Sequence, residues 1–374
     1  MSLDIREVAS RGDRRAFIAL PARLHAGRPN WVPPIYIDDR KYFDPAKNKA
    51  FGYCDVVLWL AWRDGRPVGR VMGIINRRFN QHRGEKLARF AYLETGPEPE
   101  TVHALLSRVE AWAREKGMTR IIGPYGFTDQ DPEGFLIEGF ENRATIATYY
   151  NFEWMPGYVE AEGYAKDIDY FVYKILVPKE FPEFYLKIFE RIQRKGHYTL
   201  LEFSSRKELK PYIRPAFSLM NECYVNSNIY GFAPLDPNEM DDLARRYLPV
   251  VDPRFVKAVK KGEEIIGFIV AIPDMTAGIQ KAKGKLFPFG FLHVLRASKR
   301  TKQLDLLLGG IKEPYRGLGL EVLMGVAQIK SAQKAGFEVM DSHHEMESNV
   351  KVRAEMEKMG GILYKKFRVY TKNL

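Results

Sequence analysis

Residues 311–323 read IKEPYRGLGLEVL, and they lie between an apolar run, LDLLLGG, and a long stretch with helical periodicity. A strand, a Gly-rich turn and a helix start are typical of an anion site, because the first N–H groups of a helix have no partner within it and its dipole favours negative charge. Arg316 adds a fixed cation, and the two glycines allow the backbone to approach phosphate oxygens closely. The stretch predicts a phosphate-binding loop made of Arg316, Gly317, Leu318, Gly319 and Leu320.

Glu321 stands in the first turn of the helix that follows this loop. A carboxylate there stabilises the helix by ~0.3–1 kcal/mol through the helix dipole. It would also repel a phosphate group if it pointed toward one. Two outcomes therefore stay open: Glu321 faces away from the ligand, or it weakens ligand binding.

The elements around the loop occur twice along the chain. Each copy has a β-hairpin (54–76 and 255–274), an apolar strand (88–94 and 304–311), and a helix of 3.6-residue periodicity that stops at Gly (100–117 and 320–336), followed by a further strand. The second copy is longer, and the extra residues form a segment between hairpin and strand, TAGIQKAKGKLFPFGFLHVLRASKR. This duplication predicts an α/β protein with mixed sheets and two domains, residues 1–176 and 177–374.

Residues 199–372 resemble the GNAT acyltransferase superfamily in the order of their elements and in the R-x-x-G loop. Residues 1–176 resemble the same fold in degraded form, because the loop at 92–106 has no Arg and carries Glu94, Glu98 and Glu100 at the helix start. The resemblance implies tandem GNAT domains, of which the second binds acetyl-CoA or a longer acyl-CoA. It places the pyrophosphate on the loop around Arg316, the pantetheine arm along Gly310 and Ile311, and Asn349 in contact with the cofactor.

The resemblance also implies transfer of the acyl group to an amine, which requires a base for the amine and an acid for the thiolate. Many relatives place a Tyr where this chain has Met356. The acid would then be Tyr364, Tyr315 or water, or catalysis is absent. The stretch DSHHEMESN offers bases near neutral pH, and the candidates are His343, His344, Glu345 and Glu347.

Histidine and carboxylates at this density also resemble a metal cluster. Consecutive histidines on a strand point to opposite faces, so His343 and His344 are not expected to share one ion, and no metal is predicted. The alternative is that one of them packs in the core while the other meets solvent.

The chain has 58 Lys and Arg against 47 Asp and Glu, a net charge of +11, which favours anionic partners. No zinc spacing or RNA-binding aromatic motif supports nucleic acid. Residues 284–302 combine basic and apolar side chains, and three roles stay open for them. They could make peripheral contact with an anionic membrane, cover an apolar acyl chain, or pack against their own domain. Two distant cysteines and an N-terminal stretch without an apolar core suggest a cytoplasmic protein.

The sequence thus favours an N-acyltransferase that moves an acyl group from acyl-CoA to an amine, either a small molecule or a lipid-like one. The alternative is a GNAT-fold protein that binds a ligand without turnover, which Glu321 and Met356 favour.

Overall fold

The computed structural model describes residues 3–146, 148–227 and 229–374. Within these described residues, the first half of the chain forms seven strands and five α-helices. These elements are β1 (Asp4–Glu7), α1 (Arg11–Leu24), α2 (Tyr36–Tyr42), β2 (Cys54–Arg63), β3 (Arg66–Asn76), α3 (Arg77–Arg83), β4 (Leu87–Thr95), α4 (Pro99–Glu115), β5 (Arg120–Gly123), β6 (Phe135–Glu138), α5 (Met155–Ala161) and β7 (Ala165–Leu176).

The second half repeats this order with additional helices. Its elements are α6 (Glu183–Lys195), β8 (Thr199–Glu202), α7 (Arg206–Leu209), α8 (Ile213–Asn226), α9 (Pro237–Tyr247), β9 (Val256–Lys261), β10 (Glu264–Pro273), α10 (Thr276–Lys281), α11 (Gly290–Arg300), β11 (Gln303–Ile311), α12 (Leu320–Ala335), β12 (Val339–Asp341), β13 (Glu345–Met346), α13 (Val350–Lys358) and β14 (Ile362–Asn373). Both predicted hairpins and both predicted Gly-terminated helices are present, which confirms the duplication.

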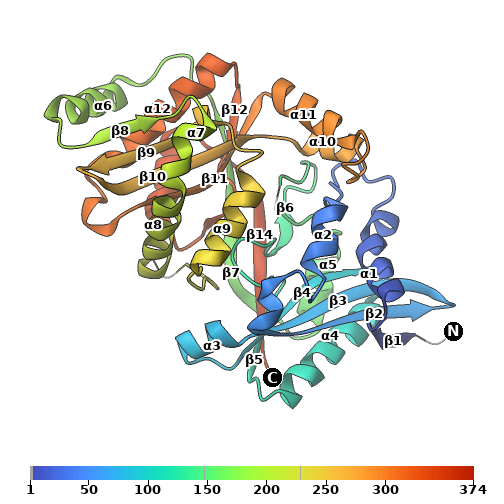
Figure 1. The fold of residues 1–374 in the computed structure, drawn as a ribbon. Helices are drawn as coiled ribbons and strands as arrows, with labels where there is room; N and C mark the ends of the chain where they lie inside the picture. The colour runs from blue at the N-terminus through green and yellow to red at the C-terminus, as the bar shows by residue number, and fades with distance from the viewer. Residues whose placement is uncertain (1–2, 147, 228) are drawn as a thin grey trace.

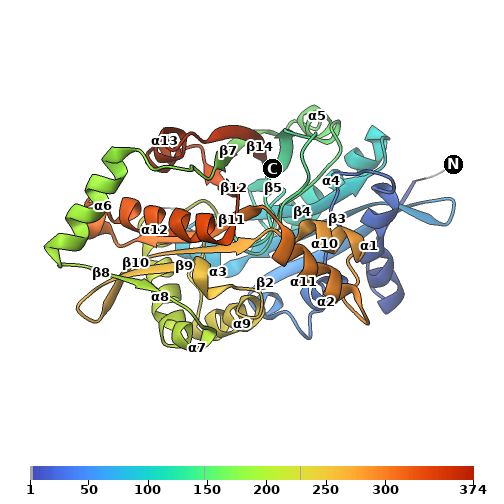
Figure 2. The ribbon, with the colours of Figure 1, turned by 90° about the horizontal axis from the view of Figure 1, so that it is seen from above.

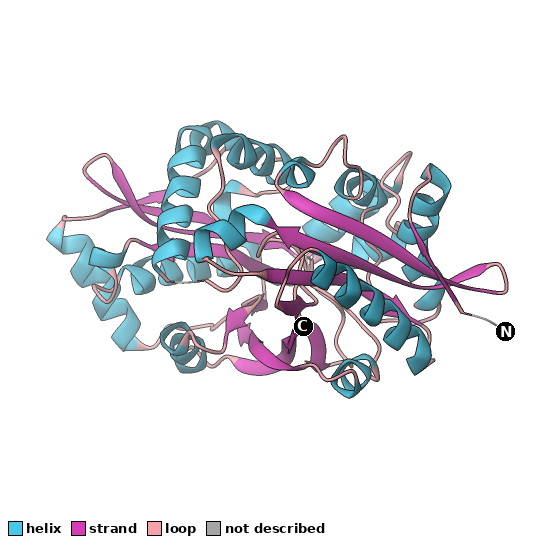
Figure 3. Cartoon of the chain, turned by 90° about the horizontal axis from the view of Figure 1, so that it is seen from below, coloured by secondary structure: helices cyan, strands magenta, loops and turns pink. Residues whose placement is uncertain are grey.

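All described strands belong to one mixed sheet, with helices on both of its faces (Figures 1 and 3). The main strand order is β1-β2-β3-β4-β5-β14-β7-β12-β11-β10-β9-β8. This order is symmetric about its centre: β1 to β5 on one side take the same places as β8 to β12 on the other, and β14 and β7 lie between them. At the centre, β14 pairs with β5 of the first half, and β7 pairs with β12 of the second. The final strand of each half therefore completes the sheet of the other half, and the two halves form one continuous framework.

The parallel strands of each half separate soon after they begin. In the second half, β11 pairs with β12 only over Gln303–Asp305 and Val339–Asp341, and β11 then runs on alone to Ile311. In the first half, the chain after β5 crosses the equivalent gap, where the Tyr125 N–H donates to the Phe90 carbonyl at 2.9 Å. The gap of the first half is thus closed by its own backbone, whereas the gap of the second half opens into a cavity.

Helices pack on both faces of the sheet in the second half. On one face, α12 buries Leu320, Leu323 and Val326 against Val259 and Ile266 of the sheet. On the other face, α8 buries Leu219, Met220 and Cys223 beside Phe268 and Ile272. Residues of both layers line the cavity. Figure 2 shows these layers from above, with α12 and α8 on either side of β9 and β10.

Candidate active site

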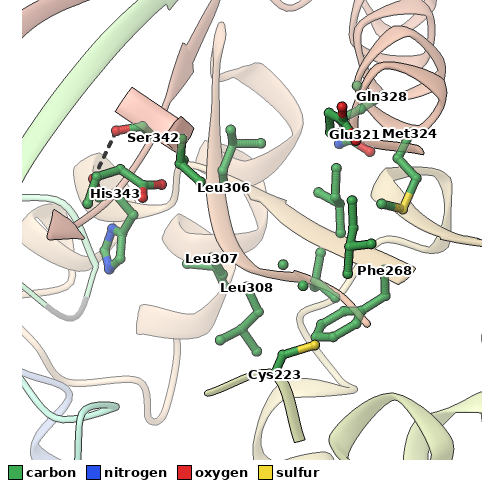
Figure 4. Close-up of a pocket in the computed structure, with 18 of the residues that line it drawn as sticks. Cys223, Phe268, Leu306, Leu307, Leu308, Glu321, Met324, Gln328, Ser342 and His343 are labelled. Carbon is green, nitrogen blue, oxygen red and sulfur yellow. Dashed lines mark hydrogen bonds between the residues drawn. The ribbon is translucent and has the colours of Figure 1, made fainter. Parts of the chain in front are cut away.

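A cavity of about 1270 Å³ occupies the gap between β11 and β12 and extends to both faces of the sheet. Most of its wall is apolar, and Figure 4 shows Leu306, Leu307 and Leu308 of β11 crossing its middle. On the α8 face it is lined by aromatic and aliphatic side chains that include Phe203, Tyr212, Ala216, Phe217, Met220, Tyr247, Phe268 and Val270. On the α12 face it is lined by Tyr185, Glu321, Met324, Gly325, Gln328, Val352 and Met356.

The predicted phosphate loop lies at one end of this cavity. Gly317 and Gly319 have positive φ angles of +73° and +87°, so the turn into α12 requires them. Of the loop residues, Arg316 and Gly317 line the cavity. Leu318 is exposed, and Leu320 is buried in the core beneath α12, so their side chains do not line it.

The two glycines of the loop differ in their surroundings. A Cβ on Gly317 would meet nothing within 4 Å, whereas one on Gly319 would come within 2.7 Å of Ile192 on α6. Gly319 therefore allows α6 to pack on the start of α12, and open space for a ligand lies beside Gly317.

Arg316 is exposed and is held by two hydrogen bonds. Its Nε donates to the Ile311 carbonyl at 2.9 Å, and its Nη2 donates to Ser227 Oγ at 3.0 Å. These bonds tie the guanidinium to the end of β11 and the end of α8, beside the loop N–H groups. Gly310 and Ile311 line the cavity at the same end of β11, and Asn349 lines it at the start of α13.

Glu321 lines the cavity at the start of α12, beside Met324 and Gln328 (Figure 4). Two turns further along α12, Gln328 is only 2% exposed, and both polar atoms of its amide lack a hydrogen-bond partner in the described structure. A buried amide without partners is costly, and it indicates a place where a polar ligand group would be bound. The side of α12 that faces the cavity therefore suits a ligand with its own amide or hydroxyl groups.

His343 and His344 follow the end of β12 and are not part of a strand. His343 has a φ of +60°, which turns the chain, and the two rings stack with centroids 5.4 Å apart. The expectation that they point to opposite faces is therefore wrong, because the strand geometry on which it rested ends at Asp341. Both rings line the cavity, so the alternative with one packed and one solvent-facing histidine is not found either.

Burial changes the pKa values of these groups. It lowers the pKa of His343 to about 4, with His344 as a further cause, and it lowers the pKa of His344 to about 3. Burial also raises the pKa of Glu345 to about 8. At neutral pH both histidines are therefore uncharged and weakly basic, whereas Glu345 carries a proton.

The first half of the chain contributes two carboxylates that sequence reasoning missed, Asp129 and Glu133. They lie in the loop between β5 and β6 and line the same cavity. Burial raises the pKa of each to about 8, and the interaction of Asp129 with Glu133 adds to the shift of Asp129. The sequence did carry a signal for these two residues. Their acidic loop follows β5 in the first half, which is the position that the DSHHEMESN stretch takes after β12 in the second half.

Glu133 and His344 meet across the two halves. Glu133 Oε1 lies 3.9 Å from His344 Nδ1, and because burial moves the two pKa values in opposite directions, the pair is uncharged near pH 7. Glu133 Oε2, Asp129 Oδ1, His343 Nδ1 and His344 Nε2 are buried and lack partners in the described structure. Four polar atoms without partners at one place in an apolar cavity form a site for a polar, hydrogen-bonding ligand group.

Glu347 and Tyr364 do not line this cavity. Glu347 accepts hydrogen bonds from Lys166 Nζ at 2.6 Å and from the Asp169 N–H at 3.1 Å. The Tyr364 hydroxyl donates to Asp341, and its ring lines a smaller pocket beside Lys174. The structure therefore brings His343, His344 and Glu345 together, but not Glu347 or Tyr364. Among the described residues, no group of three or more His, Cys, Asp or Glu side chains is arranged to hold a metal ion.

Comparison with known proteins gives relatives over the full chain. No family model matches the sequence. A bacterial ceramide synthase of Caulobacter vibrioides is 29% identical over 100% of this chain and 98% of its own length. Protein YghO of Escherichia coli is 24% identical over 99% of this chain and 95% of its own length.

Two solved structures share the fold. A tandem GNAT protein from the clavulanic acid biosynthesis pathway superposes with a TM-score of 0.56 at 12% identity, covering 100% of this chain and 98% of its own. A GCN5-related N-acetyltransferase from Sphaerobacter thermophilus superposes with a TM-score of 0.54 at 13% identity, covering 99% of this chain and 95% of its own. The chain has the tandem GNAT fold, as the resemblance in its sequence implied.

Proposed function

We propose that this protein, which has the tandem GNAT fold, is an N-acyltransferase that moves a long acyl group from acyl-CoA to a long-chain, lipid-like amine. The observation that carries the proposal is the cavity itself. It joins the predicted phosphate loop on one face of the sheet to an apolar chamber on the other, and uncharged acids and bases lie between them. The similarity to a bacterial ceramide synthase supports a lipid-like acceptor.

Acyl-CoA fits the residues on the α12 face. Its pyrophosphate would lie at Arg316, Gly317 and the start of α12, where the helix dipole and the guanidinium supply positive charge. Its pantetheine amides would pair with Gln328 and with the free end of β11. Because the α8 face is apolar, the acyl chain and the chain of the amine would both be sheltered there.

The polar cluster at the centre suits proton transfer. Amide formation joins the amine nitrogen to the thioester carbonyl carbon and breaks the carbon–sulfur bond, while the nitrogen loses a proton and the thiolate gains one. Glu133, with a pKa of about 8, is better matched to accept a proton near neutral pH than histidines with pKa values of about 4 and 3. Glu345, protonated at neutral pH, would supply the proton to sulfur.

A backbone donor for the carbonyl oxygen is available in β11. The register between β10 and β11 shifts at Val270 and Ala271, which leaves Leu307 as an extra residue in the strand. Such a bulge interrupts the ladder and leaves backbone groups unpaired. An N–H of the bulge, at the level where Leu306–Leu308 cross the cavity, would stabilise the negative charge that develops on the oxygen.

The test is to supply the purified protein with palmitoyl-CoA and a C18 long-chain amine and to detect the N-acyl product by mass spectrometry. Acetyl-CoA and a short polar amine serve as the comparison pair. We expect product from the long-chain pair at a rate at least about tenfold higher than from the short pair. Saturable binding of acyl-CoA without any product would instead support the ligand-binding alternative that Met356 and Glu321 favour.

Replacing Arg316 by Ala is expected to weaken acyl-CoA binding about tenfold, because one charge-assisted contact to phosphate is lost. Glu321→Ala, at the start of α12, is expected to strengthen binding, because it removes a carboxylate from the same end of the cavity. Calorimetric titration of palmitoyl-CoA into each variant measures both effects. Equal affinities for Arg316→Ala and the wild type would place the phosphates elsewhere.

Replacing Ala216 by Phe is expected to shift the preference toward shorter acyl chains, because Ala216 lines the apolar arm of the cavity on α8. We expect kcat/KM for palmitoyl-CoA to fall at least about tenfold, while that for a short acyl-CoA changes less than about threefold. Ser218→Phe is the matched control, since Ser218 is exposed on the same helix. An equal loss for both chain lengths would mean that the acyl chain does not lie on the α8 face.

A further inference from the structure

Residues 275–302, which lie between β10 and β11, have no full counterpart in the first half. There, β3 and β4 are joined by α3 alone, whereas β10 and β11 are joined by α10, a turn and α11. Figure 2 shows α10 and α11 on the outside of the molecule beside α1 and α2. The additional helix is therefore a feature of the surface that the sheet itself does not require.

The inner side of this segment is firmly packed. A Cβ on Gly278 would come within 2.6 Å of the His293 carbonyl, so α10 and α11 touch along their backbones. Gln280 Nε2 donates to the carbonyls of Pro29 and Trp31 at 2.8 and 2.7 Å. The segment is thus held against the first half of the chain by these contacts.

The outer side of the segment is apolar. Phe287 is 71% exposed and Phe289 is 70% exposed, and Phe291, Leu292 and Leu295 are exposed as well. These are five of the fourteen large hydrophobic side chains that are exposed in the described structure, and they lie within nine residues. On the surfaces of soluble proteins, exposed hydrophobic residues usually occur singly, so a cluster of this kind marks an interaction surface.

The charge of the segment is entirely positive. Residues 275–302 contain seven Lys and Arg and no Asp or Glu. A second copy of the chain is a poor partner, because a symmetric contact would bring like charges together. Exposed aromatic residues beside Lys and Arg match an anionic lipid surface, in which the rings enter the boundary between headgroups and acyl chains and the cations meet the phosphates.

The same helices also border the cavity. Met275, Ile279 and Val294, on their inner side, belong to the apolar cluster that contains Phe268 and Val270 of the cavity wall. A bilayer that covered the outer side would therefore lie one helical layer from the apolar arm. No helix in the described ranges is long and apolar enough to cross a membrane, so the contact would be peripheral.

We propose that residues 284–302 dock the protein on an anionic lipid bilayer, with Phe287 and Phe289 inserted into its surface. This goes beyond the proposed activity, because it concerns where the protein works and how water-insoluble chains reach the cavity. Binding to vesicles requires no turnover, so this proposal and the proposed activity can succeed or fail separately.

The experiment is cosedimentation of the full chain with vesicles of phosphatidylcholine containing 30% phosphatidylglycerol, compared with vesicles of phosphatidylcholine alone. We expect binding to the anionic vesicles that weakens with added salt, and at least tenfold lower affinity for the double variant Phe287→Ser/Phe289→Ser. Phe184→Ser is the control, since Phe184 is 65% exposed on α6, far from α11 in Figure 1, and should bind as the wild type does.

A second variant, Lys299→Glu/Arg300→Glu, separates the electrostatic contribution. We expect it to abolish the preference for anionic vesicles. Absence of wild-type binding to anionic vesicles, or unchanged binding of the double Phe variant, would overturn the proposal. A wild-type dimer in sedimentation that the Phe variant converts to monomer would overturn it in favour of a second copy of the chain.

Discussion

Replacing Glu133 by Gln is expected to lower kcat/KM for the long-chain pair by about 100-fold or more at pH 8, because positioned general bases typically contribute 10²–10⁴-fold. The amide keeps the size of the side chain but cannot accept a proton. Steady-state kinetics with palmitoyl-CoA and a C18 amine measure the effect. Glu138→Gln, an exposed residue of β6 in the same half, is the control and should leave the rate unchanged.

The pH dependence tests the same assignment. A base with a pKa of about 8 must lose its proton to act, so wild-type kcat/KM should rise as pH increases toward about 8. The Glu133→Gln variant should lack the part of this rise that ends near pH 8, and a rise that remains in the variant reports deprotonation of the amine substrate. If Asp129→Asn removed the rise while Glu133→Gln kept it, the base would be Asp129, whose pKa is also about 8.

Stability gives an independent readout of Glu133. Because burial raises its pKa from an ordinary value of 4.5 to about 8, the unfolded chain releases this proton at lower pH than the folded protein does. Glu133 therefore lowers the free energy of unfolding by an amount that grows as pH rises from about 4.5 to about 8. Glu133→Gln should raise Tm by about 2 °C or more at pH 8 and have little effect at pH 4.5, as differential scanning calorimetry would show.

The parts of this site that were predictable are the local ones. The strand, the turn with Arg316, Gly317 and Gly319, and α12 are contiguous in the sequence, and a helix start supplies anion-binding N–H groups in almost any protein. The position of Asn349 at the start of α13 follows from the same local order. Rules that relate neighbouring residues were enough to predict these positions, because the local backbone geometry alone sets them.

The centre of the cavity was not predictable in the same way. Glu133 and His344 are more than 200 residues apart, and they meet because β7 and β14 exchange places between the two halves of the sheet. The stacking of His343 on His344 depends on the positive φ of His343, which is unusual for a residue other than Gly. Long-range strand exchange and an irregular turn leave no periodic pattern in the sequence.

Gly325 is a glycine in the interior of a helix and also lines the cavity. Gly325 lies within α12, where Gly costs roughly 0.5–1 kcal/mol relative to Ala. A Cβ there would meet nothing within 4 Å, so packing against the protein does not require Gly. The residue lines the cavity between Glu321 and Gln328, and the open space beside it is where acyl-CoA is proposed to lie.

Replacing Gly325 by Phe is therefore expected to weaken binding of both acetyl-CoA and palmitoyl-CoA by about 100-fold or more, because a phenyl ring would occupy the volume proposed for the pantetheine arm. This differs from Ala216→Phe, which should affect only the long chain. Gly325→Ala is the matched control: it should bind palmitoyl-CoA nearly as the wild type does and be more stable by roughly 0.5–1 kcal/mol.

Calorimetric titration measures these affinities, and thermal unfolding shows whether each variant is folded. If Gly325→Phe unfolded at the wild-type temperature and still bound acyl-CoA normally, the cosubstrate could not lie along α12. The apolar chamber on the α8 face would then be the place to seek it, and Gln328 would be a buried amide without a role in binding. Loss of binding in a folded variant would instead fix the path of the ligand from Gly317, along Gly325, to the carboxylates at the centre of the sheet.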